Sequence, residues 1–382
     1  MNLFKMLLLV PSHLMFGAMG ILGIGLLIGI HEFGHFLFAK LFNVRTPSFS
    51  IGFGPQLISK KIGTTVFSLS AIPLGGYVEV SGMAEVGQGE QKEADNTGED
   101  SFAIKPFWQK MLILFGGIMF NILFAYFAFS LVFMLGAPKS DLLYPLGVAE
   151  DKPEIHVIRK NSAADKAGLK VGDTILAINN TQTNGQTDKL KEILHSHPDQ
   201  IVSLLIKRDD LERTVDVPLD ATDIIEHGQA KKIGTLGVYF EISKVKQFGF
   251  FESIAQGFRA TNIYLFTVIY AFKNMFTKKD ISGVGGPLMV ISETIKGAQK
   301  GFKIFLLFLA VISINLAILN LIPLPILDGG QIFFVIIETI IGKQLPKLRE
   351  YIHIGSWLFV MALVIYLTAR DIGLFNLLGL GK

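Results

Sequence analysis

The chain has 382 residues, of which 50% are hydrophobic and 18% are charged, and its mean hydropathy is +0.48. Soluble domains carry about 25% charged residues, so this composition indicates a membrane protein with soluble parts. The net charge of +3 is too small to indicate nucleic-acid binding. The absence of cysteine excludes disulfides, thiolate metal sites and a cysteine nucleophile.

Four apolar stretches approach or exceed the roughly 20 residues that cross a bilayer as a helix, although the third is marginal by length alone. They are Leu14 to about Leu41, Met111–Leu135, Ile304–Leu321 and Ile352 to about Ala369. The first stretch continues past any small-residue cleavage site, which favours a retained anchor over a cleaved signal peptide. Shorter apolar runs at residues 260–272 and 331–341 indicate interfacial or re-entrant helices.

The first predicted transmembrane segment, residues 1–46, contains the sequence HEFGH at residues 31–35. On an α-helix His31 and His35 lie on one face, and Glu32 borders that face. Two imidazoles at this spacing can hold a zinc ion, which activates a bound water, while the glutamate acts as general base. A chance match would leave ionisable residues unexplained inside an apolar span, where each costs several kcal/mol unless paired. The motif therefore predicts a zinc site.

The segment between the first two spans has two parts. Residues 47–84 are rich in Ile, Val, Phe, Thr and Ser and are interrupted by Gly and Pro, which predicts a membrane-associated β-hairpin region with a turn at KKIGTT. Residues 85–107 are acidic and polar, which indicates a cytoplasmic loop. The second transmembrane helix is expected at residues 108–136.

A soluble insert follows at residues 142–241. Its segment KNSAADKAGLKVGDTILAINN, residues 160–180, resembles the PDZ domains of the bacterial, circularly permuted kind. Such an α+β domain usually binds peptide by strand addition beside its helix. A spacer that blocks access without binding anything is the alternative interpretation.

The remaining segments are an interfacial amphipathic helix at residues 250–277, a third transmembrane helix with a following short helix at residues 300–342, and a fourth transmembrane helix at residues 350–370. Basic residues concentrate in the loop after the first span and in the loop before the fourth, so both loops are predicted to be cytoplasmic. These residues are Lys40, Arg45, Lys60, Lys61, Lys105, Lys110, Lys343, Lys347 and Arg349. With four spans, the insert lies on the extracytoplasmic side and HEFGH lies toward the cytoplasmic side.

A third zinc ligand is needed, and Asp328 is the candidate. It lies in NLIPLPILDGG, residues 320–330, and is the only acid near the end of the third span. The first and third spans run in the same direction, so Asp328 and HEFGH fall on the same side of the membrane. Pro323 and Pro325 break the helix, and the glycines after Asp328 allow a tight backbone. A helix cap is the alternative role for Asp328.

These motifs resemble a known family. HEFGH in the first span and N-x-x-P-x-P-x-L-D-G at the third are similar to the two signatures of site-2 proteases, which are intramembrane zinc metalloproteases. Four spans and one inserted PDZ domain resemble the bacterial RseP-like branch, whose best-known members carry two such domains. The supporting motifs are GFGP, PLGGY, the GG pair with Asn121 in the second span, and GGP before the third. Gln331 stands where many relatives have His, and it is assigned no role.

The resemblance implies that His31, His35 and Asp328 bind Zn²⁺, that Glu32 is the catalytic base, and that Asn320 and Asn315 contact the substrate backbone. It implies an endopeptidase of the bacterial inner membrane that hydrolyses single-pass membrane proteins by Glu-assisted attack of zinc-bound water. Anti-sigma factors, signal-peptide remnants and pheromone precursors are candidate substrates. An exposed strand edge in residues 47–80 could pair with the unwound substrate; a plain cytosolic sheet is the alternative.

Two other functions compete with this one. A catalytically inactive, PDZ-bearing membrane scaffold would not need HEFGH and LDGG intact. A metal transporter would be expected to carry polar residues along several spans, whereas here they concentrate at one depth. The predicted partners are therefore membrane protein substrates, a peptide or periplasmic substrate segment at the PDZ domain, and the lipid bilayer, with no nucleic acid.

Overall fold

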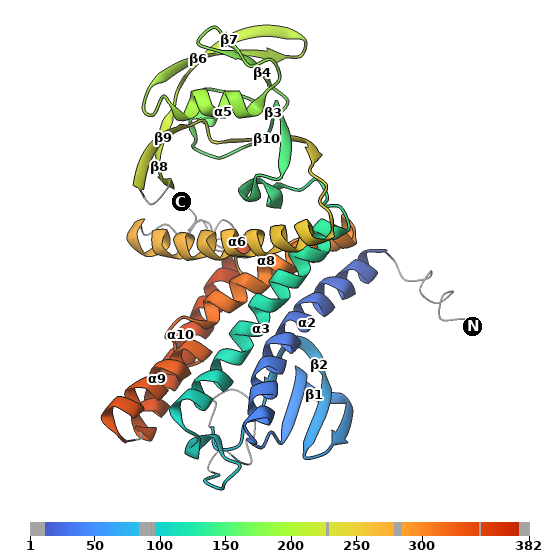
Figure 1. The fold of residues 1–382 in the computed structure, drawn as a ribbon, viewed down its shortest axis with the longest axis vertical. Helices are drawn as coiled ribbons and strands as arrows, with labels where there is room; N and C mark the ends of the chain where they lie inside the picture. Colours follow the sequence, from blue (N-terminus) through green and yellow to red (C-terminus); the bar gives the residue numbers. More distant parts are fainter. Residues whose placement is uncertain are drawn as a thin grey trace, which may run out of the picture. The chain divides into compact units, whose positions relative to one another are not determined.

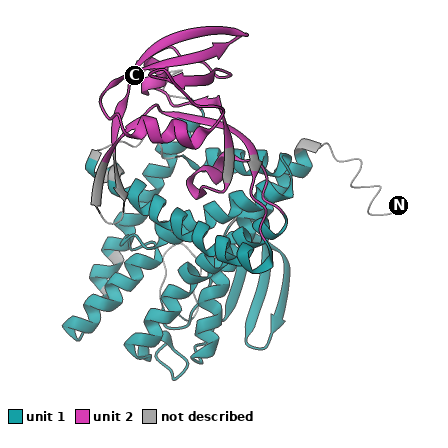
Figure 2. Cartoon of the chain, turned by 45° about the horizontal axis from the view of Figure 1, so that its top comes forward, with its two compact units in different colours: residues 1–135, 249–382 teal, residues 136–248 magenta. Residues whose placement is uncertain are grey.

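The computed structural model describes residues 12–83, 93, 96–226, 229–278, 285–343 and 345–373. The chain divides into two compact units, one formed by residues 1–135 with 249–382 and the other by residues 136–248 (Figure 2). The second unit is thus inserted between two parts of the first. Part of the predicted acidic loop, at residues 85–92 and 94–95, lies outside the described residues.

Four of the described helices in the first unit are long and apolar enough to cross a membrane, the number that the sequence predicts. They are α2 (Ser12–Leu41), α3 (Phe107–Met134), α8 (Phe302–Asn320) and α10 (Pro346–Asp371). Helix α3 is the central one, because it packs against α2 and α8 and also contacts two of the shorter helices (Figure 1). Two of the other three spans, α2 and α8, thus pack directly on α3, whereas α10 packs against α7 (Pro287–Gln299).

Three shorter or amphipathic helices complete this unit: α6 (Phe250–Lys278), α7 (Pro287–Gln299) and α9 (Asp328–Ile341). Helix α6 buries Ala260 and Tyr264, packs against α3 and α8, and leaves Phe251 and Phe266 exposed. Such a two-faced helix is typical of a membrane interface. A short 3₁₀ helix, η1 (Phe102–Ile104), precedes α3.

Strands β1 (Ser48–Ile62) and β2 (Thr65–Val78) form an antiparallel hairpin that turns at residues 63–64. Residues 49–51 pair with β2 twice, with residues 67–69 on one side and with residues 76–78 on the other. The last residues of β2 therefore form an outer edge of this small sheet. Phe49 and Val78 on its buried face pack with Phe36 of α2, which places the sheet beside HEFGH (Figure 1).

The inserted unit is a mixed α+β domain. Its main sheet has the strand order β10-β3-β4-β6-β7, with β5 paired to β4 and a separate β8–β9 hairpin. Its elements are η2 (Asp141–Leu146), β3 (Ala149–Ile158), α4 (Ala163–Lys166), β4 (Thr174–Ile178), β5 (Thr181–Gln182), α5 (Thr187–His195), β6 (Ile201–Arg208), β7 (Leu211–Pro218), β8 (Asp220–Glu226), β9 (Gln229–Thr235) and β10 (Val238–Val245).

A hydrophobic core lies between α5 and this sheet, with Leu190, Ile175 and Leu204 fully buried. Buried Asp173 ties the turn before β4 to the end of β6 by accepting two hydrogen bonds from Arg208, at 2.6 and 2.7 Å. Burial alone would raise the pKa of Asp173, but the hydrogen bonds from Arg208 and the backbone N–H of Lys170, together with the charges of both residues, hold that pKa below its ordinary value. The domain thus has its own core and its own buried ion pair.

Candidate metal centre

The site is built where α2 and α3 cross at very short range. A Cβ added to Gly34 would lie 2.2 Å from the carbonyl oxygen of Gly116, and one added to Gly117 would lie 2.3 Å from Nε2 of His35. Small residues allow membrane helices to approach until their backbones touch. The backbone of α3 therefore runs directly against the two histidine rings of α2.

This crossing gives a first prediction. Gly34→Ala removes no polar group, yet it should lower both the melting temperature and the metal affinity, because the added methyl must push α3 away. Overpacking of this kind costs about 1–3 kcal/mol of stability, and an equal cost to metal binding would lower the affinity by roughly 5- to 150-fold. Thermal unfolding and metal titration of the purified protein measure both. Gly17→Ala on the same helix is the control, since a Cβ there meets nothing within 4 Å. Equal behaviour of the two variants would contradict the proposed role of the crossing.

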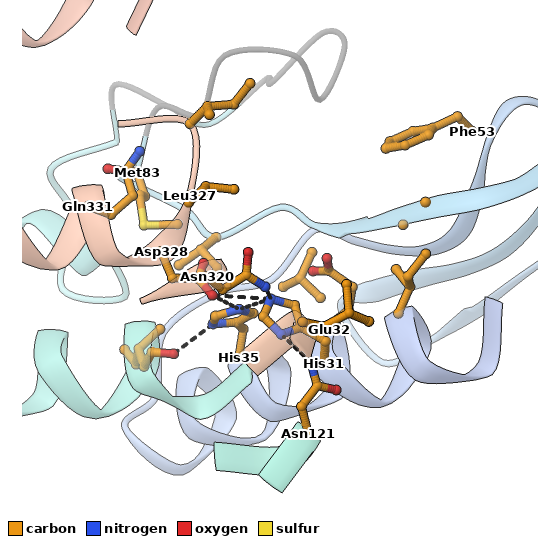
Figure 3. A pocket seen from close by; sticks show the side chains of 18 of the residues that line it. His31, Glu32, His35, Phe53, Met83, Asn121, Asn320, Leu327, Asp328 and Gln331 are labelled. Carbon is orange, nitrogen blue, oxygen red and sulfur yellow. Dashed lines mark hydrogen bonds and ion pairs between the residues drawn. The ribbon is translucent and has the colours of Figure 1, made fainter. Parts of the chain in front are cut away.

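Three side chains converge at this crossing, as Figure 3 shows. Nε2 of His31 lies 3.2 Å from Nε2 of His35. Oδ2 of Asp328 lies 3.1 Å from the first nitrogen and 3.5 Å from the second. All three residues are largely buried, and no other group of three or more such side chains was found among the described residues.

These distances fit a zinc ion. Zinc binds imidazole nitrogen and carboxylate oxygen at about 2.0–2.2 Å in a tetrahedron, which separates neighbouring ligand atoms by about 3.3–3.5 Å. The three observed separations lie close to that range. Oδ2 of Asp328 is buried and accepts no hydrogen bond from the described residues, a costly state unless a cation occupies the space between the three atoms.

The hydrogen bonding of His35 also suits a metal ligand. Its Nδ1 lies 2.8 Å from the carbonyl oxygen of Ile113. A carbonyl can only accept, so Nδ1 carries the proton and Nε2 keeps its lone pair for the metal. Such a second partner fixes the ring of a metal-bound histidine.

Asp328 reaches the site because the chain turns sharply after α8. Pro323 and Pro325 prevent the helix from continuing, and α9 begins at Asp328. The first turn of α9 then packs on the preceding loop without room for side chains. A Cβ at Gly329 would lie 2.4 Å from the backbone of Leu321, and one at Gly330 would lie 2.2 Å from a backbone oxygen. The two glycines thus hold the carboxylate beside the histidines.

Glu32 lines the same cavity, which measures about 520 Å³, without belonging to the group of three ligands. It lies under the edge of β2, where a Cβ added to Gly76 would lie 3.4 Å from Cγ of Glu32. Asn320 also lines the cavity, with its Nδ2 3.4 Å from Nε2 of His31. Asn315 is not among the lining residues. The cavity thus brings together five of the six residues that the sequence predicts for the site.

Other lining residues were not predicted, among them Phe53, Gln331, His353 and Trp357. Gln331 donates hydrogen bonds to the carbonyl oxygen of Pro325, at 3.0 Å, and to Nε2 of His353, at 2.9 Å. Arg349 in turn donates to Oε1 of Gln331. A histidine inside the fourth predicted span is the one sequence signal that could have revealed this cluster.

The chain is similar to bacterial zinc metalloproteases over most of its length. A protein of Campylobacter jejuni, named provisionally as a zinc metalloprotease, is 34% identical over 92% of both chains. A protein of Helicobacter pylori with the same provisional name is 30% identical over 93% of this chain and 97% of its own. Zinc metalloprotease RasP of Geobacillus kaustophilus is 28% identical over 92% of this chain and 96% of its own.

Solved structures resemble part of the chain, and one of them is a PDZ domain. The PDZ domain of an SdrC-like protein from Listeria monocytogenes matches 24% of this chain and 90% of its own length, at 19% identity and a TM-score of 0.20. A match at this score does not establish the fold, so the PDZ fold of residues 142–241 stays a prediction.

The model of peptidase family M50 matches residues 19–365, which include most of α2 with HEFGH, the inserted domain and the segment that carries Asp328. Together with the full-length relatives, this match shows the family and its zinc cofactor. The chain therefore belongs to peptidase family M50, the site-2 proteases.

Proposed function

We propose that this protein is an intramembrane zinc endopeptidase that cuts membrane-spanning protein substrates. One observation carries the proposal: His31, His35, Asp328 and Glu32 meet in a single cavity between helices that are long enough to cross a membrane. A scaffold without activity has no use for three buried ligand atoms at tetrahedral spacing. In a transporter we would expect polar residues along several spans.

Each residue has a distinct role in this proposal. His31, His35 and Asp328 hold the zinc ion, which when bound polarises the substrate carbonyl and makes water a better nucleophile. Glu32, which is not one of the three proposed zinc ligands, accepts the proton of the attacking water and passes it to the departing amine. Asn320 lies beside the zinc ligands, where its amide can hold the substrate backbone. Asn315 does not line the cavity, so a contact between Asn315 and the substrate backbone has less support.

The edge of β2 supports an extended substrate. A helical substrate hides its peptide bonds, so it must unwind before hydrolysis. Residues 76–78 pair with β1 on one side, and no other strand among the described residues pairs with them. Gly75, Gly76 and Val78 line the cavity above Glu32. An unwound segment that adds to this edge would place its backbone over the zinc ligands.

Trapping natural substrates tests the proposal. In a bacterium whose only copy carries Glu32→Gln, membrane proteins or membrane peptides that the active enzyme removes should accumulate, and mass spectrometry of the membrane fraction would identify them. Their cleavage products should appear only in cells with the active enzyme. A membrane proteome that is unchanged by the substitution would contradict proteolysis as the function.

The proposal also includes an orientation in the bacterial inner membrane. The inserted domain, residues 136–248, would face away from the cytoplasm and select substrates by binding an extended segment, as a PDZ domain does. The cavity would lie toward the cytoplasmic side. The basis is the concentration of Lys and Arg in the loop after the first span and in the loop before the fourth, which predicts that both loops are cytoplasmic.

Cysteine labelling tests this orientation. The chain has no cysteine, so a single one gives a clean signal. Cysteine in place of Asp210, whose side chain is 92% exposed, should react with a membrane-impermeant thiol reagent in intact spheroplasts. Cysteine in place of exposed Lys343, between α9 and α10, should react only after lysis. The reverse pattern would overturn the orientation.

A further inference from the structure

A buried amide on α3 faces the metal site from the side opposite Asp328. Asn121 has no exposed surface, and its Nδ2 lies 3.3 Å from Nδ1 of His31. Its Oδ1 is buried and has no hydrogen-bond partner among the described residues. Figure 3 shows Asn121 approaching His31 from below while Asp328 and Asn320 approach from above. Neither the metal ligands nor the proposed proton transfer accounts for this amide.

The role of His31 as a metal ligand decides which of its two ring nitrogens carries the proton. His31 faces Asp328 and His35 through Nε2, so that nitrogen must offer its lone pair to the metal. A neutral imidazole carries one proton, which must then sit on Nδ1. Nδ1–H requires an acceptor, and an amide NH₂ at 3.3 Å is a second donor. A half-turn of the Asn121 amide exchanges its two atoms and puts Oδ1 at that position. The same rotation removes the buried, unpartnered oxygen.

His35 provides an internal comparison. Its Nδ1 donates to the carbonyl oxygen of Ile113, also on α3. Ile113, Gly117 and Asn121 follow each other at intervals of four and share one face of the helix. Gly117 lets both rings approach α3. One turn before it, the carbonyl oxygen of Ile113 accepts from His35, and one turn after it, the rotated amide of Asn121 would place Oδ1 beside His31. One face of α3 can thus orient both ligands.

We propose that Asn121 is a positioning residue that accepts a hydrogen bond from Nδ1–H of His31 through Oδ1 and so fixes the tautomer that binds zinc. This inference rests on the proposed function, because it needs His31 as a zinc ligand. Loss of such a partner typically costs 10–100-fold in metal affinity. Asn121 lines the cavity but is not one of the three clustered ligands, so in this proposal it acts through the ring of His31.

The test distinguishes three possible roles of the Asn121 side chain: accepting a hydrogen bond, donating one, and filling space. Asp in place of Asn121 keeps an acceptor oxygen at the same position but cannot donate, whereas Ala keeps neither. Zinc affinity of the full-length protein in detergent is measured by competition with a chromophoric chelator. We expect Asn121→Ala to bind zinc about 10–100-fold more weakly and Asn121→Asp to bind it about as tightly as the unmodified protein, or more tightly. Excess zinc should restore cleavage by Asn121→Ala.

Ser313→Ala is the matched control. Oγ of Ser313 donates to the backbone oxygen of Asn121 at 2.8 Å, and Ser313 is also fully buried. This variant loses a buried hydrogen bond that links α8 to the backbone of Asn121, without touching His31. Its zinc affinity should therefore change by less than about threefold, and each variant's melting temperature reports any general loss of packing.

Three results would overturn the inference alone, and a fourth would overturn the proposed function with it. Equal losses in Asn121→Ala and Asn121→Asp would mean that the amide donates or only packs. Unchanged zinc affinity in Asn121→Ala would mean that His31 needs no acceptor there. A loss in Ser313→Ala as large as that in Asn121→Ala would assign the effect to packing. If His31→Ala binds zinc as the unmodified protein does, the proposed function fails together with this inference.

Discussion

Replacing Glu32 with glutamine is expected to leave zinc in place and to lower the rate of peptide cleavage by about 10²–10⁴-fold. The glutamine side chain has nearly the same shape, and Glu32 is not one of the three clustered ligands, so binding of the ion should persist. An amide cannot accept the proton of the attacking water. Metal analysis of the purified variant, together with a cleavage assay in detergent or proteoliposomes, measures the two effects separately.

Glu79→Gln is the control for this substitution. Glu79 is also a buried glutamate, directly after β2, where it accepts a hydrogen bond from Ser48 at 3.2 Å, but it does not line the cavity. Its replacement should leave cleavage near the original rate. Substantial cleavage by Glu32→Gln, or a parallel loss of zinc, would refute the assignment of Glu32 as the base.

Replacing Asp328 with alanine is expected to abolish both zinc binding and cleavage. Loss of an outer partner of a metal ligand costs about 10–100-fold in affinity, so loss of one of three direct ligands should cost more than 10²-fold. The substitution also leaves two histidine nitrogens 3.2 Å apart without their anion. Zinc content after dialysis and isothermal titration with zinc measure the loss.

Asp371→Ala distinguishes a ligand from a helix cap, the alternative role for Asp328. The carboxylate of Asp371 accepts hydrogen bonds from the backbone N–H groups of Gly286, at 3.3 Å, and Met289, at 2.9 Å, at the beginning of α7. Its loss should lower the melting temperature, as loss of a cap does, and leave zinc affinity unchanged. If Asp328→Ala behaved like Asp371→Ala, with zinc fully bound, Asp328 would be a cap and the metal site would need another third ligand.

Much of this site could be predicted because local rules determine it. The spacing of His31 and His35 places them on one face of any helix, whatever surrounds that helix. Four apolar stretches required four long helices, and the break at Pro323 and Pro325 required the chain to turn where Asp328 follows. The parallel directions of the first and third predicted spans then indicated that Asp328 lies near HEFGH, and Asp328 and His31 do lie 3.1 Å apart.

The rest depends on contacts that no local pattern encodes. The rotation of α3 about its axis is set by its contact with Gly34, and this rotation decides that Asn121 faces His31. The hydrogen bond between Gln331 and His353 joins two helices whose packing the sequence does not specify. The double pairing of residues 49–51 likewise follows from the folding of one long hairpin onto itself. The spacing of apolar residues predicts which face of a helix or strand is buried, but not which element packs against that face.

The central claim, hydrolysis of a membrane-spanning substrate at this site, is tested most directly by the position and origin of the new carboxyl group. A substrate trapped by Glu32→Gln would be reconstituted in liposomes with the zinc-loaded enzyme in water enriched in oxygen-18, and the products sequenced by mass spectrometry. We expect one heavy oxygen in a new C-terminal carboxylate within or next to the apolar span, and none with Glu32→Gln. Cuts confined to soluble segments, or equal cleavage by both proteins, would contradict it.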